Sequence, residues 1–352
     1  MSTTKEQDLA NLDFLKYGLE HKFGELHFIM DSATGLKGFV AIHNTKLGPA
    51  LGGLRLARYP NEKSAILDGM RLARGMSYKA ALANLPLGGG KGVIIEPETE
   101  FDRQGYMDVI GKFIEQLNGR YITAVDLGTN LEDMDRIYTH TKYVSSLSSH
   151  HGDPSPYTAK GVLHGIEALV DYVLKKPSLK GVHIAIQGLG HVGSHLAEYL
   201  NACGARLTVS DIDEDKTHAA KIALGAAIVP SAEIHATDCD VFAPCARGGI
   251  INDSTINEIK APIIAGAANN QLAHAYHGER LMEKGITYAV DYVINTGGLL
   301  FAASRYLKTE ETIVHLQIEN IGQTLISIVE QARKSHTPTN IVADRIAEEK
   351  LK

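Results

Sequence analysis

Apolar positions in the first 145 residues alternate between strand-like runs and one long helical pattern. Residues 61–82 predict a helix, because Ile66, Met70 and Ala73 recur at helical spacing. Asn61 precedes them as a suitable N-cap. Around this helix, short apolar runs predict strands and a glycine-rich segment predicts a turn: strands at 36–43, 93–95 and 121–125, and the turn at 87–92.

From residue 180 onward, short apolar runs alternate with helical segments. This rhythm predicts βαβ units and a parallel sheet. A turn-rich stretch at 145–156 separates the two halves, and we expect the chain to cross between domains there. The expected elements are strands at 182–186, 206–209, 226–229, 241–243, 263–265 and 287–290, and helices at 158–174, 192–203 and 343–351.

Length and composition narrow the class of protein. A chain of 352 residues is long for one domain, so we expect two: residues 1–145 joined by 331–352, and residues 146–330. The net charge of −6 gives no reason to expect nucleic acid or an anionic membrane as partner. Residues 1–13 lack the apolar core of a secretory signal. Only three cysteines occur, which favours a reducing cytoplasm over a disulfide framework.

The segment 188–193 (GLGHVG) carries the G-x-G-x-x-G pattern between an expected strand and an expected helix. In this context the first glycine permits a tight turn, the second lets backbone N–H groups approach a pyrophosphate, and the third permits close helix packing. The helix N-terminus favours the negative charge. The expected dinucleotide-binding residues are Gly188, Leu189, Gly190, His191, Val192, Gly193, Asp211 and Ile212.

Asp211 ends the next expected strand, 18 residues after Gly193. A carboxylate at this place accepts hydrogen bonds from the ribose hydroxyls and repels a 2′-phosphate. Acidic residues follow it at 213–215, and no arginine lies nearby in the sequence to receive a phosphate. We therefore expect NAD rather than NADP as the cofactor; the simpler alternative is a turn aspartate at a strand end.

Lys91 follows three glycines and precedes a short apolar strand. The segment is not a phosphate-binding P-loop, because Gly92 stands where that motif requires Ser or Thr. A lysine with its ordinary pKa of about 10.4 is a weak base at neutral pH, but burial and a second cation both lower this pKa. Lys79, 12 residues earlier, is a candidate for the second cation.

Several short segments along the chain form one ordered set of motifs: 52–55 (GGLR), 74–81 (RGMSYKAA), 87–91 (LGGGK), 123–129 (TAVDLGT), 152–156 (GDPSP), 244–246 (PCA), 268–271 (ANNQ) and 291–298 (DYVINTGG). In this order they resemble the superfamily of leucine, phenylalanine, valine and glutamate dehydrogenases, with leucine dehydrogenase as the closest branch. The similarity extends from about residue 35 to the C-terminus. The resemblance implies an α/β protein of two domains: an N-terminal substrate domain with a mixed sheet and a Rossmann-type, doubly wound dinucleotide domain.

The resemblance also implies roles for individual residues. Lys79 would bind the substrate carboxylate, Lys91 would be the base that activates water, and Asp126 would carry protons to and from the amine. Without the resemblance, Lys79 and Asp126 are equally well explained as a helix-end cation and a strand-end turn residue. It also implies that Thr158, Ala246 and Asn269 lie near the nicotinamide or its ribose, and that Asn295 binds the substrate.

The expected side-chain pocket favours apolar amino acids. Glutamate dehydrogenases carry a lysine where this chain has Leu51, and a buried leucine would leave a substrate carboxylate unpaired, at a cost of several kcal/mol. Ala124 and Val293 suit a branched aliphatic side chain, so leucine is expected first, with valine and isoleucine. A valine or phenylalanine dehydrogenase is the close alternative, and a non-catalytic NAD sensor is the alternative of another class. The pocket is expected to comprise Leu51, Gly52, Gly53, Met76, Ala124 and Val293.

Two departures from the family pattern are visible. His191 stands where relatives often have asparagine, which would affect cofactor affinity. His150 and His151 lack a third ligand at a recognised spacing, so we expect loop histidines and no metal site. We expect a homo-oligomer whose partners are the amino acid, its 2-oxo acid and ammonia.

Overall fold

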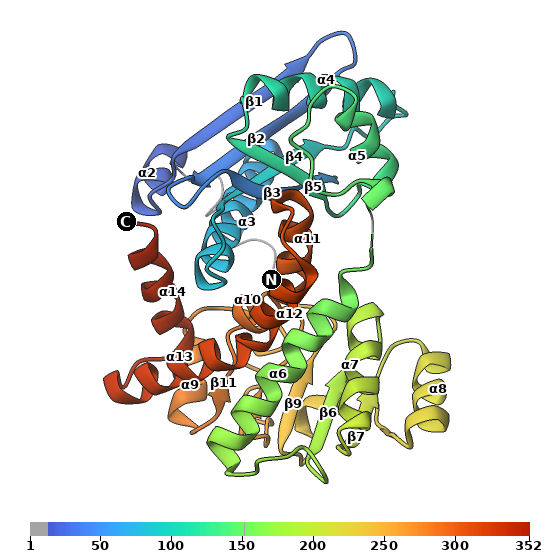
Figure 1. Ribbon diagram of the computed structural model, residues 1–352, viewed down its shortest axis with the longest axis vertical. Coiled ribbons are helices and arrows are strands. Elements are labelled where there is room, and N and C mark those ends of the chain that lie inside the picture. Colours follow the sequence, from blue (N-terminus) through green and yellow to red (C-terminus); the bar gives the residue numbers. More distant parts are fainter. Residues whose placement is uncertain (1–12, 151) are drawn as a thin grey trace. The chain divides into compact units, whose positions relative to one another are not determined.

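The computed structural model of the protein describes residues 13–150 and 152–352. They form two units, shown in Figure 1. The first contains the described residues up to 152, with Arg305–Lys308 and Ala347–Lys352, and the second contains Asp153–Ser304 and Thr309–Ile346. The segment 1–12, expected to carry no secretory signal, and His151 lie outside the described residues.

A mixed sheet of five strands forms the centre of the first unit. Its strands are β1 (Glu25–Asp31), β2 (Leu36–Asn44), β3 (Ala50–Ala57), β4 (Gly88–Ile95) and β5 (Tyr121–Val125). They lie in the order β1-β2-β4-β3-β5. β2 is antiparallel to β1 and β4, whereas β3 is parallel to β4 and β5. Consequently β3, β4 and β5 end at the same edge of the sheet.

Helices cover both faces of this sheet: α2 (Phe14–Glu20), α3 (Glu62–Leu82), α4 (Arg103–Gln116) and α5 (Leu131–Tyr138). Side chains alternate along β2, so Phe39 packs with Met70 of α3, while Val40 joins the core formed with Ile110 of α4. The expected N-cap of α3 is confirmed, since the Asn61 side chain accepts a hydrogen bond from the Ser64 backbone N–H. The helix is thus fixed both at its start and along its buried face.

The expectation of a turn at 87–92 is wrong, because these glycines belong to β4. A Cβ on Gly89 would collide with the backbone nitrogen of Ser77 in α3, and one on Gly90 would lie 2.8 Å from the Tyr121 ring. The glycines therefore allow a helix and a neighbouring side chain to approach the sheet closely. Local preference pointed to a turn, but packing from both sides holds the segment extended.

The second unit contains a sheet of six parallel strands. They are β6 (His183–Gln187), β7 (Arg206–Ser210), β8 (Ala227–Ile228), β9 (Val241–Pro244), β10 (Ile263–Ile264) and β11 (Thr287–Tyr288). The order β11-β10-β9-β6-β7-β8 is that of a doubly wound dinucleotide-binding sheet. The strand rhythm of the sequence predicted each strand to within two residues at either end. The predicted fold class is confirmed.

Most helices of the structure belong to this second unit, and two of them pack closely because they carry glycines. Its helices are α6 (Ser155–Leu174), α7 (His191–Ala202), α8 (Glu214–Leu224), α9 (His277–Glu283), α10 (Asp291–Ile294), α11 (Gly297–Leu307), α12 (Glu311–Glu319), α13 (Ile321–Ser335) and α14 (Thr339–Lys350), with a 3₁₀ turn at Ile234–Ala236. The last residues of α11 and α14 belong to the first unit, as does the 3₁₀ turn at Ser148–His150. A Cβ on Gly165 of α6 would lie 2.9 Å from Leu325 of α13, and one on Gly322 of α13 would lie 2.9 Å from Ala168. α6 and α13 therefore form a tight pair.

The two units divide differently from the expected ranges. The division falls after residue 152 rather than 145, and only the last six residues of the expected return at 331–352 join the first unit. The residues of α13 stay in the second unit because they pack on α6. Lys350 reaches the first unit, where its Nζ donates to the Ala81 carbonyl at 3.1 Å.

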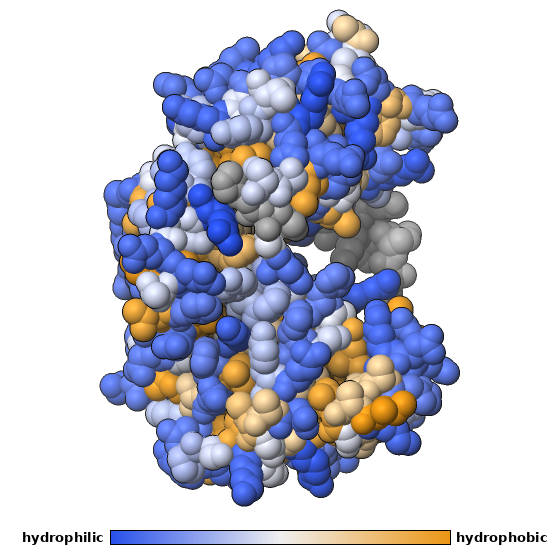
Figure 2. Space-filling model, turned by 45° about the vertical axis from the view of Figure 1, so that its right-hand side comes forward, coloured by the Kyte–Doolittle hydropathy of each residue, from blue (hydrophilic) through white to orange (hydrophobic). Residues whose placement is uncertain are grey.

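In the described residues, no helix is both long and apolar enough to cross a membrane. The face seen in Figure 2 is mostly hydrophilic, with apolar side chains in small groups. Such scattered apolar positions are ordinary for protein surfaces.

Candidate active site

Lys91 and Asp126 meet over β3, beside the end of β5. Lys91 lies on β4 and Asp126 directly follows β5, with β3 between these two strands. The Lys91 Nζ lies 2.9 Å from Asp126 Oδ2, and the lysine is only 5% exposed. A Cβ on Gly53 of β3 would lie 2.7 Å from the Asp126 Cβ. The glycine thus leaves the space over β3 in which the carboxylate lies.

Arg55 and Asp68 extend this ion pair into a network. Arg55 Nε donates to Asp126 Oδ2 at 2.9 Å, and its other end donates to Asp68 Oδ2 at 2.8 Å. The Tyr59 hydroxyl also donates to Asp68 Oδ2, at 2.8 Å. The result is a chain of alternating charges that begins at the buried lysine and ends at a tyrosine.

The pKa values of the central pair follow from this arrangement. Burial lowers the pKa of the Lys91 ammonium; Asp126 opposes this effect, and Arg55 adds to it. Burial would raise the pKa of Asp126, but Lys91 and Arg55 outweigh it and hold that pKa below its ordinary value. Arg55 is therefore a cation that depresses the pKa of Lys91, the part that sequence reasoning assigned to Lys79. A lysine shifted in this direction is better suited to accept a proton.

The other expected substrate residues of the first unit lie on β3, α3 and β5. Leu51 is 2% exposed, and Gly52 lies beside it on β3 with its carbonyl accepting a hydrogen bond from Tyr121 at 2.7 Å. A Cβ on Gly52 would collide with the Gly90 carbonyl, so the strands approach here more closely than a side chain permits. The remaining expected residues are partly buried: Met76 and Lys79 on α3, and Ala124 on β5.

The G-x-G-x-x-G segment of the second unit has the geometry expected of a dinucleotide turn. Gly188 has φ +94°, in the region that favours glycine. A Cβ on Gly193 would collide with the Gly188 carbonyl, whereas a Cβ on Gly190 would meet open space. Gly190 is the N-cap of α7, and no side chain caps that helix. These residues therefore fit a pyrophosphate at the uncapped start of α7.

Asp211 lies at the end of β7 and holds this turn. Its Oδ2 accepts a hydrogen bond from the Leu189 backbone N–H at 2.6 Å, and its Oδ1 accepts one from Asp213 at 2.9 Å. Burial would raise the pKa of Asp211, but these backbone hydrogen bonds outweigh it and keep the pKa below its ordinary value. Ile212 is 91% exposed, and His191 and Val192 begin α7. Asp211 thus presents a stable negative charge beside the turn.

Loops after β6, β9 and β10 converge at the same end of the second sheet. A Cβ on Gly188 would lie 2.8 Å from the Ala246 Cβ. Asn295 Nδ2 donates to Asn269 Oδ1 at 2.7 Å and to the Ala267 carbonyl at 3.0 Å. Asn295 is 4% exposed, and its Oδ1 has no hydrogen-bond partner among the described residues. This buried acceptor fits an N–H donor of a ligand.

Two expected residues of the second unit lie in helices. The Thr158 hydroxyl, in α6, donates to the Pro154 carbonyl at 3.1 Å. Val293 is buried in α10. In the described part of the chain, neither side chain forms a hydrogen bond with another expected site residue. The expected residues that the structure brings together in the second unit are chiefly Gly188, Ala246, Asn269 and Asn295.

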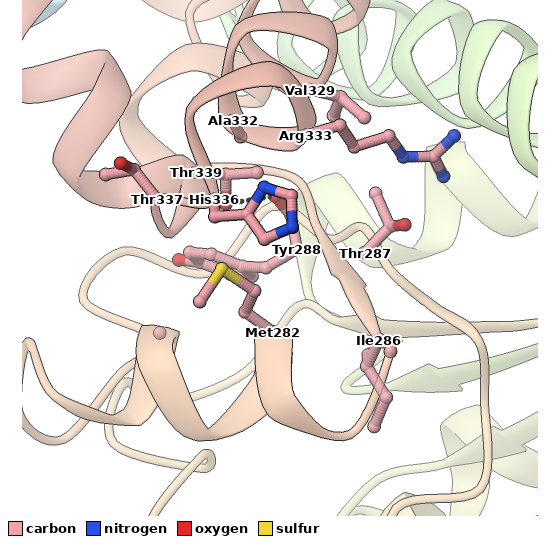
Figure 3. Close-up of a pocket in the computed structure, with 12 residues that line it drawn as sticks. Met282, Ile286, Thr287, Tyr288, Val329, Ala332, Arg333, His336, Thr337 and Thr339 are labelled. Atoms are coloured by element: carbon pink, nitrogen blue, oxygen red, sulfur yellow. Dashed lines mark hydrogen bonds between the residues drawn. The ribbon is translucent and has the colours of Figure 1, made fainter.

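A separate pocket of about 440 Å³ lies in the second unit, between α9, β11 and the end of α13 (Figure 3). Met282, Tyr288 and Val329 line its apolar part, with Arg333 and His336 nearby. None of its lining residues is an expected site residue. The chemistry predicted from the sequence therefore lies elsewhere.

Comparisons with known proteins show the family of the chain. Two family models match the chain: the dimerisation domain of Glu/Leu/Phe/Val dehydrogenases over residues 22–143, and Glutamate/Leucine/Phenylalanine/Valine dehydrogenase over residues 207–340. The leucine dehydrogenase of Geobacillus stearothermophilus is 43% identical, and the match covers 97% of this chain and 94% of that protein. The chain belongs to the Glu/Leu/Phe/Val dehydrogenase family. It is accordingly an amino-acid dehydrogenase, and the family and fold imply a nicotinamide cofactor.

Relatives with other substrates are about as similar. The L-tryptophan dehydrogenase of Nostoc punctiforme is 44% identical over 90% of each chain. The crystal structure of L-tryptophan dehydrogenase from the same organism matches with a TM-score of 0.87 and covers 96% of this chain and 98% of that one. The phenylalanine dehydrogenase of Lysinibacillus sphaericus is 38% identical, and the match covers 97% of this chain and 91% of that protein. Overall similarity alone therefore does not select the substrate side chain.

Sequence reasoning missed Arg55, Asp68 and Tyr59. Arg55 stands in the segment 52–55 that carries the family resemblance, so a signal for it was present. Asp68 and Tyr59 have none, because their link to the site depends on how α3 packs against the sheet.

Proposed function

We propose that this amino-acid dehydrogenase catalyses the reversible, NAD-dependent oxidative deamination of apolar L-amino acids, with leucine preferred and valine and isoleucine also accepted. The products are the 2-oxo acid, ammonia and reduced cofactor. The observation that carries this proposal is the buried Lys91–Asp126 ion pair over β3, the strand that also carries Leu51.

The proton transfers divide between the two charged residues. Lys79 binds the substrate carboxylate, and Asp126 removes a proton from the substrate ammonium. A nicotinamide cofactor held at the glycine turn 188–193 would supply the hydride acceptor, and loss of the hydride from the α-carbon would leave a substrate iminium. Neutral Lys91 takes a proton from water as its oxygen bonds to that carbon, which gives a carbinolamine. Asp126 then returns its proton to the nitrogen, the C–N bond breaks as ammonia leaves, and the hydroxyl proton passes to solvent water as the carbonyl of the 2-oxo acid forms. The lowered pKa of Lys91 supports its part as the base.

The residues at the second sheet support NAD. Gly188, Gly190 and Gly193 fit the pyrophosphate, and the ionised Asp211 beside the turn disfavours a 2′-phosphate. The unpartnered Oδ1 of Asn295 fits an N–H of the substrate amine.

Leu51 supports the choice of an apolar side chain. It is buried in β3 beside Gly52, so a charged substrate side chain placed there would lose its hydration without gaining a partner. Branched aliphatic side chains differ from one another by a methylene or a branch, which changes transition-state binding by only about 1–3 kcal/mol. We therefore propose overlapping activity on the three branched-chain amino acids.

The test is an NAD⁺ reduction assay at mildly alkaline pH, over a panel that includes leucine, valine, isoleucine, phenylalanine, tryptophan and glutamate. The highest kcat/KM is expected for leucine and the lowest for glutamate. Activity on glutamate with none on branched chains would overturn the substrate assignment, and a clear preference for tryptophan or phenylalanine would replace it.

A second experiment addresses the base. Lys91→Ala is expected to abolish turnover while NADH still binds, as measured by its fluorescence. Retention of the rate would refute the role of Lys91, and loss of NADH binding would show that the variant is damaged more widely.

We also propose that the enzyme is a cytoplasmic homo-oligomer. The match of residues 22–143 to a dimerisation domain supports the oligomer, and the few cysteines support a reducing compartment. Light scattering coupled to size-exclusion chromatography tests the first point, and a monomer at micromolar concentration would contradict it.

A further inference from the structure

The two oxygens of the Asp126 carboxylate have different surroundings. Oδ2 lies 2.9 Å from Lys91 Nζ and accepts a hydrogen bond from Arg55 Nε, also at 2.9 Å. Among the described residues, none donates a hydrogen bond to Oδ1. One oxygen is therefore engaged by two cations and the other is left for a further donor.

Arg55 is itself held from its far side. Arg55 lies on β3, and its Nη1 donates a hydrogen bond to Asp68 Oδ2 of α3 at 2.8 Å. The Tyr59 hydroxyl donates to the same Asp68 oxygen. A planar guanidinium bonded at both ends to carboxylates has little freedom to turn. The position of Arg55 is thus set by a helix on one side and by Asp126 on the other.

We propose that Arg55 is a positioning residue that keeps Asp126 Oδ2 occupied, so that Oδ1 faces the amine of the substrate. The proposal rests on the proposed function, in which Asp126 exchanges protons with that amine. Arg55 would touch neither substrate nor cofactor and would act only through the orientation and charge of Asp126.

The charges around the pair give the proposal a readout beyond the rate. Asp126, Arg55 and Asp68 act on the charge of Lys91, and Lys79 lies on α3, the helix that packs on β4. Arg55 lowers the pKa of Lys91, so removing its charge raises that pKa and moves the rise of kcat/KM with pH to higher pH. A purely structural role would lower the rate without this displacement.

The experiment compares Arg55→Ala and Arg55→Lys with Arg58→Ala. Arg58 is an exposed arginine on the loop after β3, 3.8 Å from Glu96, and serves as the matched control. We expect Arg55→Ala to lower kcat about 100-fold with little change in KM, because a misplaced proton carrier slows chemistry more than binding. Added guanidinium ion should restore part of kcat, and Arg55→Lys should keep the wild-type pH profile because it keeps the charge. Arg58→Ala should match the wild type.

Thermal unfolding of each variant shows whether it folds. If Arg55→Ala does not fold, Arg55→Lys still tests the proposal. A folded Arg55→Ala enzyme with wild-type kcat and an unmoved pH profile would overturn the proposal. If the unaltered enzyme failed to deaminate amino acids, the proposed function would fail instead, so the two failures are distinguishable.

Discussion

Gly53 and Asp126 lie so close together that a Cβ on the glycine would stand 2.7 Å from the Cβ of the aspartate. Real Cβ atoms are not found at this distance, so an added methyl group must displace the carboxylate or the strand. The position of Asp126 thus depends on the absence of a side chain from the neighbouring strand.

This contact predicts the effect of Gly53→Ala. We expect kcat to fall about 100-fold, because a displacement of about 1 Å in a proton carrier has an effect of this size. Gly75→Ala is the matched control, because Gly75 lies in α3 and a Cβ there meets open space. It should keep full activity and raise the melting temperature, since alanine is favoured over glycine in helices by about 1 kcal/mol. A fully active Gly53→Ala enzyme would contradict the relationship.

The environment of Lys91 predicts a pH dependence. Lys91 must be neutral to accept a proton in deamination, so kcat/KM should rise with pH as the ammonium loses its proton. Burial lowers the pKa of Lys91 from its ordinary value of 10.5, so the rise should level off below that pH. Reductive amination needs the proton on Lys91 and should fall over the same range. Initial rates in both directions, measured from about pH 7 to about pH 11, test this dependence. An apparent pKa of kcat/KM at or above the ordinary lysine value would count against it.

Asp211 offers two variants that separate charge from hydrogen bonding. Asp211→Asn removes the charge but keeps an oxygen for the Leu189 N–H, whereas Asp211→Ala removes both. Both should reduce the preference for NAD over NADP by roughly 10- to 100-fold, the range that a hydrogen bond to a charged group supports. Only Asp211→Ala should also loosen the glycine turn and raise KM for NAD well above the value for Asp211→Asn.

The measurement is kcat/KM with each cofactor at saturating amino acid. Asp215→Asn is the control, because Asp215 is an exposed carboxylate in the first turn of α8. If Asp211→Asn and Asp211→Ala kept the wild-type ratio of kcat/KM for NAD to that for NADP, as Asp215→Asn should, Asp211 would not select the cofactor.

His43 predicts how stability depends on pH. It is 3% exposed, its Nε2 donates to the His21 carbonyl at 3.0 Å, and its Nδ1 accepts from Ser77 at 2.8 Å. Burial lowers the pKa of His43 from 6.5 to about 4. The unfolded chain therefore binds this proton more readily, so stability is present above pH 6.5 and is lost as the pH falls towards 4. The full loss is about 3 kcal/mol.

Melting temperatures of the wild type and of His43→Gln, measured across this range, test the effect. The variant should be less stable at neutral pH but lose less on acidification. His218→Gln, at an exposed position in α8, should follow the wild type. Parallel curves for the wild type and His43→Gln would show that another group governs the acid response.

Local sequence signals predict the sheet and the glycine turn of the second unit. Its strands, the turn at 188–193 and the following Asp211 are recognisable because apolar runs, glycines and a strand-end carboxylate are local signals. The family resemblance supplied Lys91 and Asp126, which the structure places 2.9 Å apart. The apolar pocket expected around Leu51 rests on the same resemblance.

The residues that surround Lys91 and Asp126 come together only in the folded chain. Arg55 is 71 residues from Asp126 along the chain, and the two meet because β3 pairs with β5. The first part of β4, residues 88–92, was likewise not predicted, since glycines favour turns locally. These glycines are extended here because α3 and Tyr121 pack against them. Sequence periodicity reports which face of an element is buried, but it carries no record of which distant element will cover that face.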